Sequence, residues 1–473
     1  MKLFWAAAPV AAVLILALGL SGIGWGTAVL MVTTGLALLG ALRSSRFAWA
    51  AFVASLTMSG LSIGLMGQNV LPEHVFLALL LTHALRKQPV TTVRSTLILG
   101  KEKYRPSLVL GVVLIVTWLL VTLIFSTFNS PSPNSSLRLL AWLCLNLIAL
   151  FIVRGMLRDS VRMVSDALVT SVCVFGIYVC GWLVANVTGL TNVFVEADYA
   201  SKTFRLKGLM LEPNLLAGLA LLLLCVAFAY REAIGPRIFW IGACVLAFGI
   251  FITYTRAAWI VLFVVLAHAI WTAGIRHRLL VILGLGTAVV VIGLLISDMS
   301  MSAGSITDTI LRRFDSLFDF DSGTGAYRFR TWEIAWQEIH MDGWFHGHGY
   351  NSFSQSHDAL DTSDGTLYLS LLWLALVYDG GLLAFGLFTC AFLLIWANAK
   401  IGSNWFFIAF VIISTSTNPT WFMFPWVFAA LLLPKVRNAT VSTSPGSQVR
   451  YYLPAKEVAP VGVPTTPPLR SRP

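Results

Sequence analysis

Most of the acidic charge of this chain lies in one stretch, residues 298–364, which reads DMSMSAGSITDTILRRFDSLFDFDSGTGAYRFRTWEIAWQEIHMDGWFHGHGYNSFSQSHDALDTSD. It holds 11 of the 21 Asp and Glu residues, whereas the sequence on both sides consists largely of apolar runs. A polar stretch of this kind between apolar runs is typical of a membrane protein with several spans and one large water-facing loop. This loop and the few charges near the ends of the spans are therefore where a functional site is expected.

The composition excludes a soluble enzyme. The chain has 473 residues, of which 58% are hydrophobic and 11% are charged, and its mean hydropathy is +0.82. Soluble domains carry roughly 25% charged residues. The net charge of +11 does not indicate nucleic-acid binding, because the basic residues form short clusters between apolar runs, as in the cytoplasmic loops of membrane proteins.

The apolar runs predict an all-α, polytopic transmembrane helical bundle of about 12–14 spans, since each crossing takes roughly 20 apolar residues. Eleven candidate spans fall within residues 1–297, at 4–21, 24–41, 47–66, 70–85, 107–127, 136–153, 165–187, 209–229, 238–253, 257–274 and 279–297. We interpret 4–21 as a retained first span and not a signal peptide, because many apolar runs follow it. The C-terminal spans within 365–434 are 366–378, 381–397 and a long stretch, 404–433, interrupted at Asn418-Pro419.

The positions of Lys and Arg predict the orientation, because cytoplasmic loops carry an excess of both. With the amino terminus inside, alternate loops are basic, and they carry Arg43 and Arg46, residues 86–105, Arg154 to Arg162, Arg231 and Arg237, and Arg276 and Arg278. The uncharged loop 128–136 and the acidic loop 298–364 are then extracytoplasmic. If 404–433 crosses once, the tail 435–473, which has seven prolines, is a disordered cytoplasmic extension.

Cysteine and histidine spacing does not indicate a metal site. The six cysteines all fall inside apolar runs, and none has the CxxC spacing typical of zinc sites or redox motifs. His346 and His348 lie two residues apart in the acidic loop, but no third ligand follows in register. We therefore expect the protein to work without a metal ion.

Three arginines lie on the predicted outer side, where the positive-inside rule expects few. Arg205 precedes Leu211-Glu-Pro-Asn214, Arg256 lies at the turn of an apolar hairpin, and Arg328 lies in the acidic loop. Because guanidinium binds phosphate in a bidentate fork, the three arginines, which have no obvious acidic partner, favour a diphosphate headgroup as ligand. The alternative is that they reach lipid phosphates or cap helix C-termini.

Acid–base candidates are fewer. Asp364 stands at the end of the acidic loop and directly precedes an apolar run, so it is also expected to be the N-cap of the next helix. Glu212 stands at the start of another apolar run and has the same two interpretations. His357 is a further candidate base within the loop.

Four segments, in this order, resemble the O-antigen ligase and polymerase superfamily of bacterial envelope glycan enzymes. They are Arg205-x-x-Gly208 with Glu-Pro-Asn214, Thr255-Arg256, Arg328-x-x-x-Trp332 with Trp344-Phe-His-Gly-His-Gly349, and Asp364-Gly-Thr-Leu followed by Asp379-Gly-Gly-Leu. The ligases carry His-Asn at the end of the loop, where this chain has Asp364-Gly365 or, farther back, His357-Asp358. Ligase and polymerase therefore both stay open.

The resemblance implies a metal-independent glycosyltransferase of the bacterial inner membrane, without a cofactor, that acts at the extracytoplasmic side. Its donor would be a glycan linked to undecaprenyl diphosphate, and its acceptor a lipid, a glycan or a protein. Arg205, Arg256 and Arg328 would bind the diphosphate, and Asp364, His357 or Glu212 would accept the proton of the acceptor hydroxyl.

Two other classes compete with the transferase. A transporter or flippase of lipid-linked oligosaccharide should have polar residues in mid-span, and the spans are nearly free of them. A structural assembly scaffold would not need Arg256.

Overall fold

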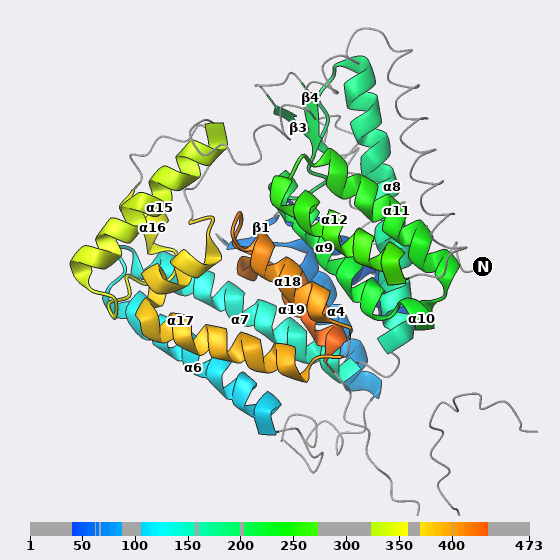
Figure 1. Ribbon diagram of the computed structural model, residues 1–473. Helices are drawn as coiled ribbons and strands as arrows, with labels where there is room; N and C mark the ends of the chain where they lie inside the picture. The colour runs from blue at the N-terminus through cyan, green and yellow to red at the C-terminus, as the bar shows by residue number, and fades with distance from the viewer. Residues whose placement is uncertain are drawn as a thin grey trace, which may run out of the picture. The chain divides into compact units, whose positions relative to one another are not determined.

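The computed structural model describes residues 40–61, 63–65, 68–87, 106–156, 160–198, 203–272, 323–357, 369–400 and 402–433. Within these ranges the chain is α-helical apart from two short β-hairpins (Figure 1), so the all-α class is confirmed. Several predictions lie outside the described residues, namely the spans 4–21 and 279–297, nearly all of 24–41, Asp364, and the tail 435–473.

Four described helices are long and apolar enough to cross a membrane, namely α6 (Pro106–Phe128), α7 (Pro133–Met156), α8 (Ser160–Thr188) and α17 (Leu372–Asn398). Six shorter helices are also apolar, namely α4 (Pro72–Lys87), α9 (Pro213–Ala229), α11 (Pro236–Ile252), α12 (Arg256–Thr272), α18 (Asn404–Ile413) and α19 (Met423–Leu432). Most of these helices coincide with predicted spans. The structure therefore agrees with a membrane protein of several spans.

Proline marks the start of half of these ten helices. Pro72, Pro106, Pro133, Pro213 and Pro236 are the first residues of α4, α6, α7, α9 and α11. The fixed φ of proline suits the first turn of a helix, and its missing N–H has no helical partner to lose there. The loops that separate the predicted spans therefore end where a proline stands.

Helix α9 is the central element of its half of the bundle. Every residue from Leu215 to Phe228 is buried, and α9 packs against α8, α11, α12, α18 and α19. A helix that is apolar on all sides is stable only when neighbours surround it. The short α10 (Arg231–Ile234) connects α9 to α11. Figure 1 shows α18 and α19 beside α9 and α12, and α6, α7 and α17 grouped together.

The predicted span 47–66 is wrong in its second half. Helix α3 (Ser45–Ser55) ends eleven residues early, and turns lead into the hairpin of β1 (Ile63–Leu65) and β2 (Gln68–Val70). The Gly60 N–H donates to the Leu209 carbonyl at 2.9 Å, and a Cβ at Gly60 would meet that oxygen at 2.8 Å. The turn is therefore held against another loop, a tertiary contact that hydropathy does not report.

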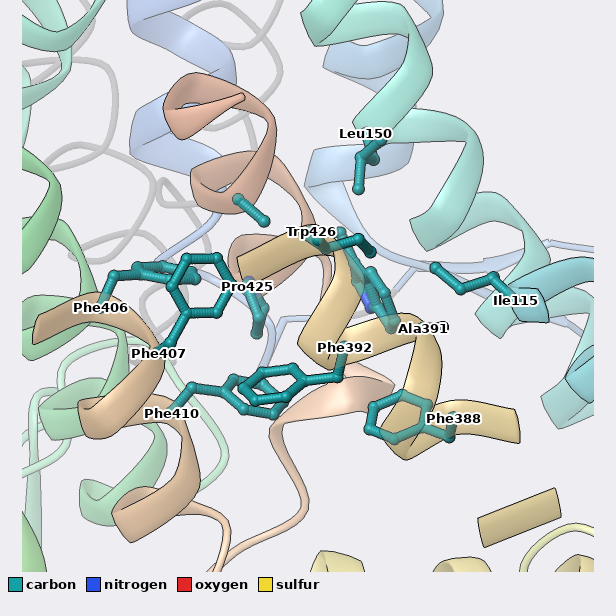
Figure 2. Close-up of a pocket in the computed structure, with 12 residues that line it drawn as sticks. Ile115, Leu150, Phe388, Ala391, Phe392, Phe406, Phe407, Phe410, Pro425 and Trp426 are labelled. Atoms are coloured by element: carbon teal, nitrogen blue, oxygen red, sulfur yellow. The ribbon is translucent and has the colours of Figure 1, made fainter. Parts of the chain in front are cut away.

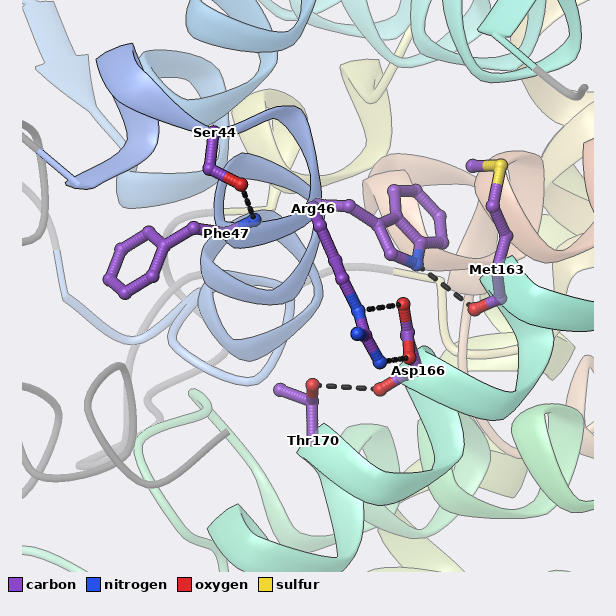
Figure 3. A network of polar contacts seen from close by, with 7 residues as sticks. Ser44, Arg46, Phe47, Met163, Asp166 and Thr170 are labelled. Carbon is purple, nitrogen blue, oxygen red and sulfur yellow. Dashed lines mark hydrogen bonds and ion pairs between the residues drawn. The ribbon is translucent and has the colours of Figure 1, made fainter. Parts of the chain in front are cut away.

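Figure 3 shows how α3 is fastened to α8. The Arg46 guanidinium donates two hydrogen bonds to the Asp166 carboxylate, at 2.7 and 2.5 Å, and the Trp49 indole N–H donates to the Met163 carbonyl at 3.0 Å. Bidentate pairs of this kind fix orientation as well as distance. Arg46, one of the two arginines of the first predicted cytoplasmic loop, therefore has a structural role.

The predicted spans 366–378 and 381–397 form one interrupted helix, α17. Gly381 breaks it with a φ of 66° and a ψ of −178°. The carbonyls of Tyr378 and Asp379 accept from the N–H groups of His348 (3.0 Å) and Gly349 (2.9 Å), and the Leu382 N–H donates to the Trp344 carbonyl (2.8 Å). The two glycine-containing segments noted in the sequence therefore bind each other.

Helix α17 begins at Leu372, with Leu371 as its N-cap, so the expectation that Asp364 caps this helix is wrong. The Leu372 N–H donates to the Ser414 carbonyl at 2.9 Å, and Leu369 is buried against α15 (Gly323–Asp342). The Trp332 indole of α15 also donates to the Ser370 hydroxyl at 3.3 Å. Because these contacts hold 369–371 in a non-helical conformation, the apolar run starts before the helix does.

The predicted interruption at Asn418-Pro419 is confirmed, but 404–433 does not cross once. Helices α18 and α19 flank a non-helical segment that contains the 3₁₀ turn Pro419–Trp421. The Lys400 N–H, shortly before α18, donates to the Leu432 carbonyl at the end of α19 at 2.9 Å. The start of α18 and the end of α19 therefore lie together, as in a helical hairpin.

Aromatic side chains fill the space between this hairpin and α17. Figure 2 shows Phe388 and Phe392 of α17 facing Phe407 and Phe410 of α18, with Trp426 of α19 beside them. Phe392 stacks on Phe410 with ring centroids 5.4 Å apart. The pocket that remains, about 40 Å³, is lined by apolar side chains. These side chains pack α17 against the α18–α19 hairpin, and they offer apolar surface and not a polar site.

We predict that Gly347→Ala destabilises the protein by about 1–3 kcal/mol, because a Cβ there would meet the Asp379 carbonyl oxygen and the Gly380 Cα, both at 2.7 Å. Backbone atoms at the break of α17 cannot move aside as the end of a flexible side chain can. Thermal unfolding of the purified protein in detergent measures the effect as a lower Tm.

The control is Gly386→Ala within α17, where nothing lies within 4 Å of the added carbon. Alanine is a better helix former than glycine by roughly 0.5–1 kcal/mol, so this variant should unfold at the same temperature or higher. Equal Tm values for the two variants would refute the close packing of the 347–349 loop on α17.

Candidate functional site

Arg205 lies in a polar cluster that joins three parts of the chain. It stands on β4 (Thr203–Leu206), and its guanidinium donates to the Thr253 carbonyl at 3.1 Å and to the Asn214 side-chain oxygen at 3.4 Å. The Thr255 hydroxyl donates to the same Asn214 oxygen at 3.1 Å. Asn214 therefore connects the β-hairpin, the start of α9 and the turn between α11 and α12.

Two helix N-termini meet at this cluster. Helix α9 starts at Pro213, and α12 starts at Arg256, directly after Thr255. The first N–H groups of a helix have no intrahelical acceptor, and the helix dipole places a partial positive charge there. Two such ends beside Arg205, with half-buried Arg256 at the start of one of them, make this region suited to an anion such as phosphate.

The turn that carries Arg256 is tightly built. Tyr254 has a left-handed φ of 54°, which is uncommon for a residue other than glycine. The Thr253 hydroxyl accepts from the Thr255 N–H at 3.3 Å and donates to the Thr255 hydroxyl at 3.0 Å. Strained turns persist when surrounding contacts hold them, and they are frequent at functional sites. The predicted hairpin turn is confirmed, and its geometry is fixed by its own threonines.

The expectation that Arg205 lacks an acidic partner is wrong. Strands β3 (Val195–Asp198) and β4 pair antiparallel, with Glu196 opposite Arg205. One guanidinium nitrogen lies 3.7 Å from the Glu196 carboxylate, which is more exposed than the arginine. The strand register, which the sequence does not reveal, places this acid. The pair orients the guanidinium while its other nitrogens face Thr253 and Asn214.

Two further residues of the predicted site are Glu212 and Arg328. Glu212 occupies the N-cap position of α9, but its side chain makes no capping hydrogen bond, so the structural interpretation of Glu212 is not supported. Arg328 lies half-buried on α15, a helix that contributes none of the hydrogen bonds and ion pairs described above for the Arg205 cluster. The proposed role of Arg328 stays a prediction.

A second polar cluster lies where α15 contacts the first part of α17. Both oxygens of the Glu338 carboxylate are engaged, one by the Tyr378 hydroxyl at 2.7 Å and the other by His357 Nε2 at 2.9 Å. His357 stands at the end of α16 (Ser352–Ser356) and stacks on Phe353, with ring centroids 4.3 Å apart. Glu338 therefore holds α15, α16 and α17 together.

Both ring nitrogens of His357 face acceptors. Nδ1 lies 2.9 Å from the Phe353 carbonyl oxygen, which only accepts, and Nε2 faces Glu338. With both ring nitrogens engaged by protein partners, His357 has no free nitrogen to present to an acceptor hydroxyl in this geometry. It is suited instead to positioning the chain.

The contacts of His357 fix the last described residue before 358–368, the range that includes Asp364. This residue, His357 itself, is anchored on α15 and α17 through Glu338. Leu369 and Ser370, the first described residues after this segment, also pack on α15. Both attachment points of the Asp364 segment are therefore fixed on the same helices.

Another histidine of the acidic loop, His348, lies close to this cluster. Its ring contacts Tyr378 in a tilted arrangement, with centroids 4.3 Å apart, and its Nε2 lies 3.5 Å from the Asp342 carboxylate. Burial lowers the pKa of His348, an effect that nearby Asp342 partly opposes, so the imidazole is neutral at pH 7. In the part of the chain that the structure describes, no three His, Cys, Asp or Glu side chains are grouped to hold a metal ion.

Sequence reasoning missed Glu338 and Tyr378. Glu338 follows Thr331 and Ala335, which face inward on α15, at the helical spacing of three to four residues. An acid on the inward face of an amphipathic helix is a usable signal for a buried polar contact. Tyr378 gave no such signal, because an aromatic residue in an apolar run is usually core.

Comparison with known proteins adds no identification. No protein-family model matches the chain, and no curated protein sequence matches it.

We predict that Glu338→Ala lowers the free energy of unfolding by about 1–2 kcal/mol, because the Tyr378 hydroxyl and His357 both lose their partner. Glu333→Ala removes the same number of atoms from an exposed position of the same helix and should change stability by less than about 0.5 kcal/mol. Denaturation of both purified variants gives the comparison. Equal stabilities would show that the Glu338 contacts contribute nothing.

Proposed function

We propose that this protein is a membrane glycosyltransferase of the O-antigen ligase or polymerase kind. It transfers a glycan from a polyprenyl diphosphate carrier to a lipid, glycan or protein acceptor. The observation that supports this most is the cluster of Arg205 and Arg256 at the joined N-termini of α9 and α12. An apolar bundle that gathers this much positive potential at one site is suited to an amphiphile with an anionic headgroup.

The arginine cluster would act on the leaving group. When the bond between the sugar and the diphosphate breaks, negative charge develops on the departing phosphate oxygen. Guanidinium groups and helix N-termini that already point to this position stabilise that charge without reorganisation. Asn214 and Thr255 hold the cluster, and Glu196 keeps Arg205 oriented.

Asp364 is the proposed general base. Its carboxylate would accept the proton of the acceptor hydroxyl as that oxygen attacks the anomeric carbon. The anchoring of His357 by Glu338 supports this division of roles, because His357 is engaged at both nitrogens. Glu212, whose side chain makes no capping hydrogen bond at the start of α9, stays a further candidate.

The proposed orientation places both clusters outside the cytoplasm of a bacterial cell, in the inner membrane. It rests on the basic residues of the alternate loops. The Arg205 cluster and residues 298–364 lie on the side opposite to these basic loops. In this orientation the active site faces the leaflet at which envelope glycans are assembled.

One observation favours the competing class, a transporter or flippase of lipid-linked oligosaccharide. The sequence indicated almost no polar residues in mid-span, yet Asp379 is buried beside the break of α17, and interrupted helices with buried charges are typical of transporter sites. A reconstituted assay separates the classes. A transferase forms glycosylated product from donor and acceptor on one side, whereas a flippase only moves the donor between leaflets.

We predict that Arg205→Ala and Arg256→Ala each reduce glycan transfer by about 100-fold or more, because one preorganised charge partner is lost. Transfer is measured with purified protein in liposomes that contain a polyprenyl diphosphate-linked glycan. Lysine at either position should restore little activity, since a point charge does not reproduce the guanidinium fork. Near-normal transfer by both alanine variants at normal protein level would refute the diphosphate site.

Arg328→Ala belongs in the same series, with exposed Arg330 of the same helix as its control. Loss of transfer in Arg328→Ala, but not in Arg330→Ala, would assign Arg328 to the donor site.

A separate prediction concerns the base. Asp364→Asn should reduce transfer by about 100-fold or more with thermal stability unchanged, since an amide cannot accept the proton. His357→Ala should reduce transfer much less, because its proposed role is positioning. The same liposome assay, together with a thermal unfolding curve for each variant, decides the point. A fully active Asp364→Asn variant and an inactive His357→Ala variant would reverse the roles.

A further inference from the structure

Two interrupted helices meet around a small polar cavity that has no part in the proposed transfer. Helix α17 breaks at Gly381, two residues after Asp379, and the segment 414–422 separates α18 from α19. The cavity between them has a volume of about 10 Å³, room for the centre of one water or one small ion. Its lining residues are Trp118, Thr122, Tyr350, Leu372, Ala375, Leu376, Asp379, Asn418 and Thr420.

The polar side chains of this cavity are mostly oxygen ligands and amides, and Asp379 is the one acidic residue among its described lining residues. Asp379 is 7% exposed, and Thr122, Tyr350, Asn418 and Thr420 are buried to at least the same degree. The nine described residues that line the cavity include no Lys, Arg or His. A carboxylate buried at membrane depth needs a proton, a basic group or a cation as its partner.

The hydrogen bonds around the cavity leave lone pairs available. The Thr420 hydroxyl donates to the Asn418 side-chain oxygen at 2.6 Å, and the Thr122 hydroxyl donates to the Trp118 carbonyl at 2.9 Å. With their hydrogens directed to protein acceptors, both hydroxyl oxygens keep lone pairs for another ligand. The Tyr350 hydroxyl is buried beside Thr420 yet makes no well-formed hydrogen bond.

The backbone beside the cavity is fixed by the loop that follows α15. The Gly349 N–H donates to the Asp379 carbonyl at 2.9 Å, and Asn351, two residues further on, has a left-handed φ of 54°. These contacts hold the Asp379 side chain at the cavity.

We propose that Asp379, together with oxygens of Asn418, Thr420 and Thr122, binds one monovalent alkali cation, of which Na⁺ fits a cavity of this size best. A single carboxylate neutralises a single positive charge. Carbonyl and hydroxyl oxygens complete the shell, as hard cations require. Coordination of an ion by interrupted helices at membrane depth is an established use of such breaks.

The proposal is tested by thermal unfolding of the purified full-length protein in NaCl, LiCl, KCl and choline chloride at equal ionic strength. Wild type should show a saturable rise in Tm with NaCl, of about 3 °C or more relative to choline chloride, because a ligand of the native state stabilises it. Asp379→Asn should unfold at one temperature in all four salts. Glu333→Gln, which alters an exposed carboxylate, should keep the wild-type response.

A second pair of variants avoids loss of the charge. Thr122→Val removes one ligand oxygen at nearly constant volume, and the NaCl concentration at half-saturation should rise at least about fivefold. Thr122→Ser keeps the oxygen and should respond like wild type. A wild-type Tm that is the same in sodium and choline would overturn the proposal and assign Asp379 a proton. An unchanged sodium response in Asp379→Asn would also overturn it, since the ion would then bind elsewhere.

This test does not depend on glycan transfer. A protein with no transferase activity that still shows the sodium response through Asp379 would keep the cation site and lose only the proposed function.

Discussion

Backbone groups at membrane depth must be paired, and the break of α17 shows how the chain meets this constraint. A helix interrupted at Gly381 leaves carbonyls without an intrahelical donor, and lipid offers none. The N–H groups of His348 and Gly349 supply the missing bonds to Tyr378 and Asp379. Because these bonds bring the loop onto α17, they also place His348 against Tyr378. The chemistry of this region depends on them.

The arginine cluster is also built from helix ends, but there the helix ends present N–H donors and not carbonyl acceptors. There the groups concerned are the N-termini of α9 and α12, and Asn214 connects the two helix starts through Arg205 and Thr255. Helix ends that expose donors attract anions, whereas breaks that expose carbonyls and carboxylates attract cations. The two proposals thus give the bundle one site of each sign, both built from helix termini.

Hydropathy and charge predicted the helices well, because a bilayer demands long apolar runs and Pro marks many of their starts. They placed two spans where α17 is one interrupted helix, and they did not predict the end of α3, since both features depend on hydrogen bonds to distant loops. The sequence motifs predicted Arg205 and Arg256 as site residues. In the structure, Arg205 donates to the turn that ends at Arg256. Glu196 and Glu338 escaped notice because a strand register and the inward face of α15 place them.

The α18–α19 hairpin connects the arginine cluster with the region around the break of α17. A ligand bound beside the buried Asp379 would therefore affect how these parts are held together. Helix α18 packs on α9 and α12, which carry the arginine cluster, and its last turn accepts the N–H of Leu372 at the start of α17. The Asn418 and Thr420 ligands of the proposed cation lie in the turn of this hairpin. An ion bound there would tie α17 to the hairpin. It would thereby fix the distance between the anion site and the helices that anchor the Asp364 segment.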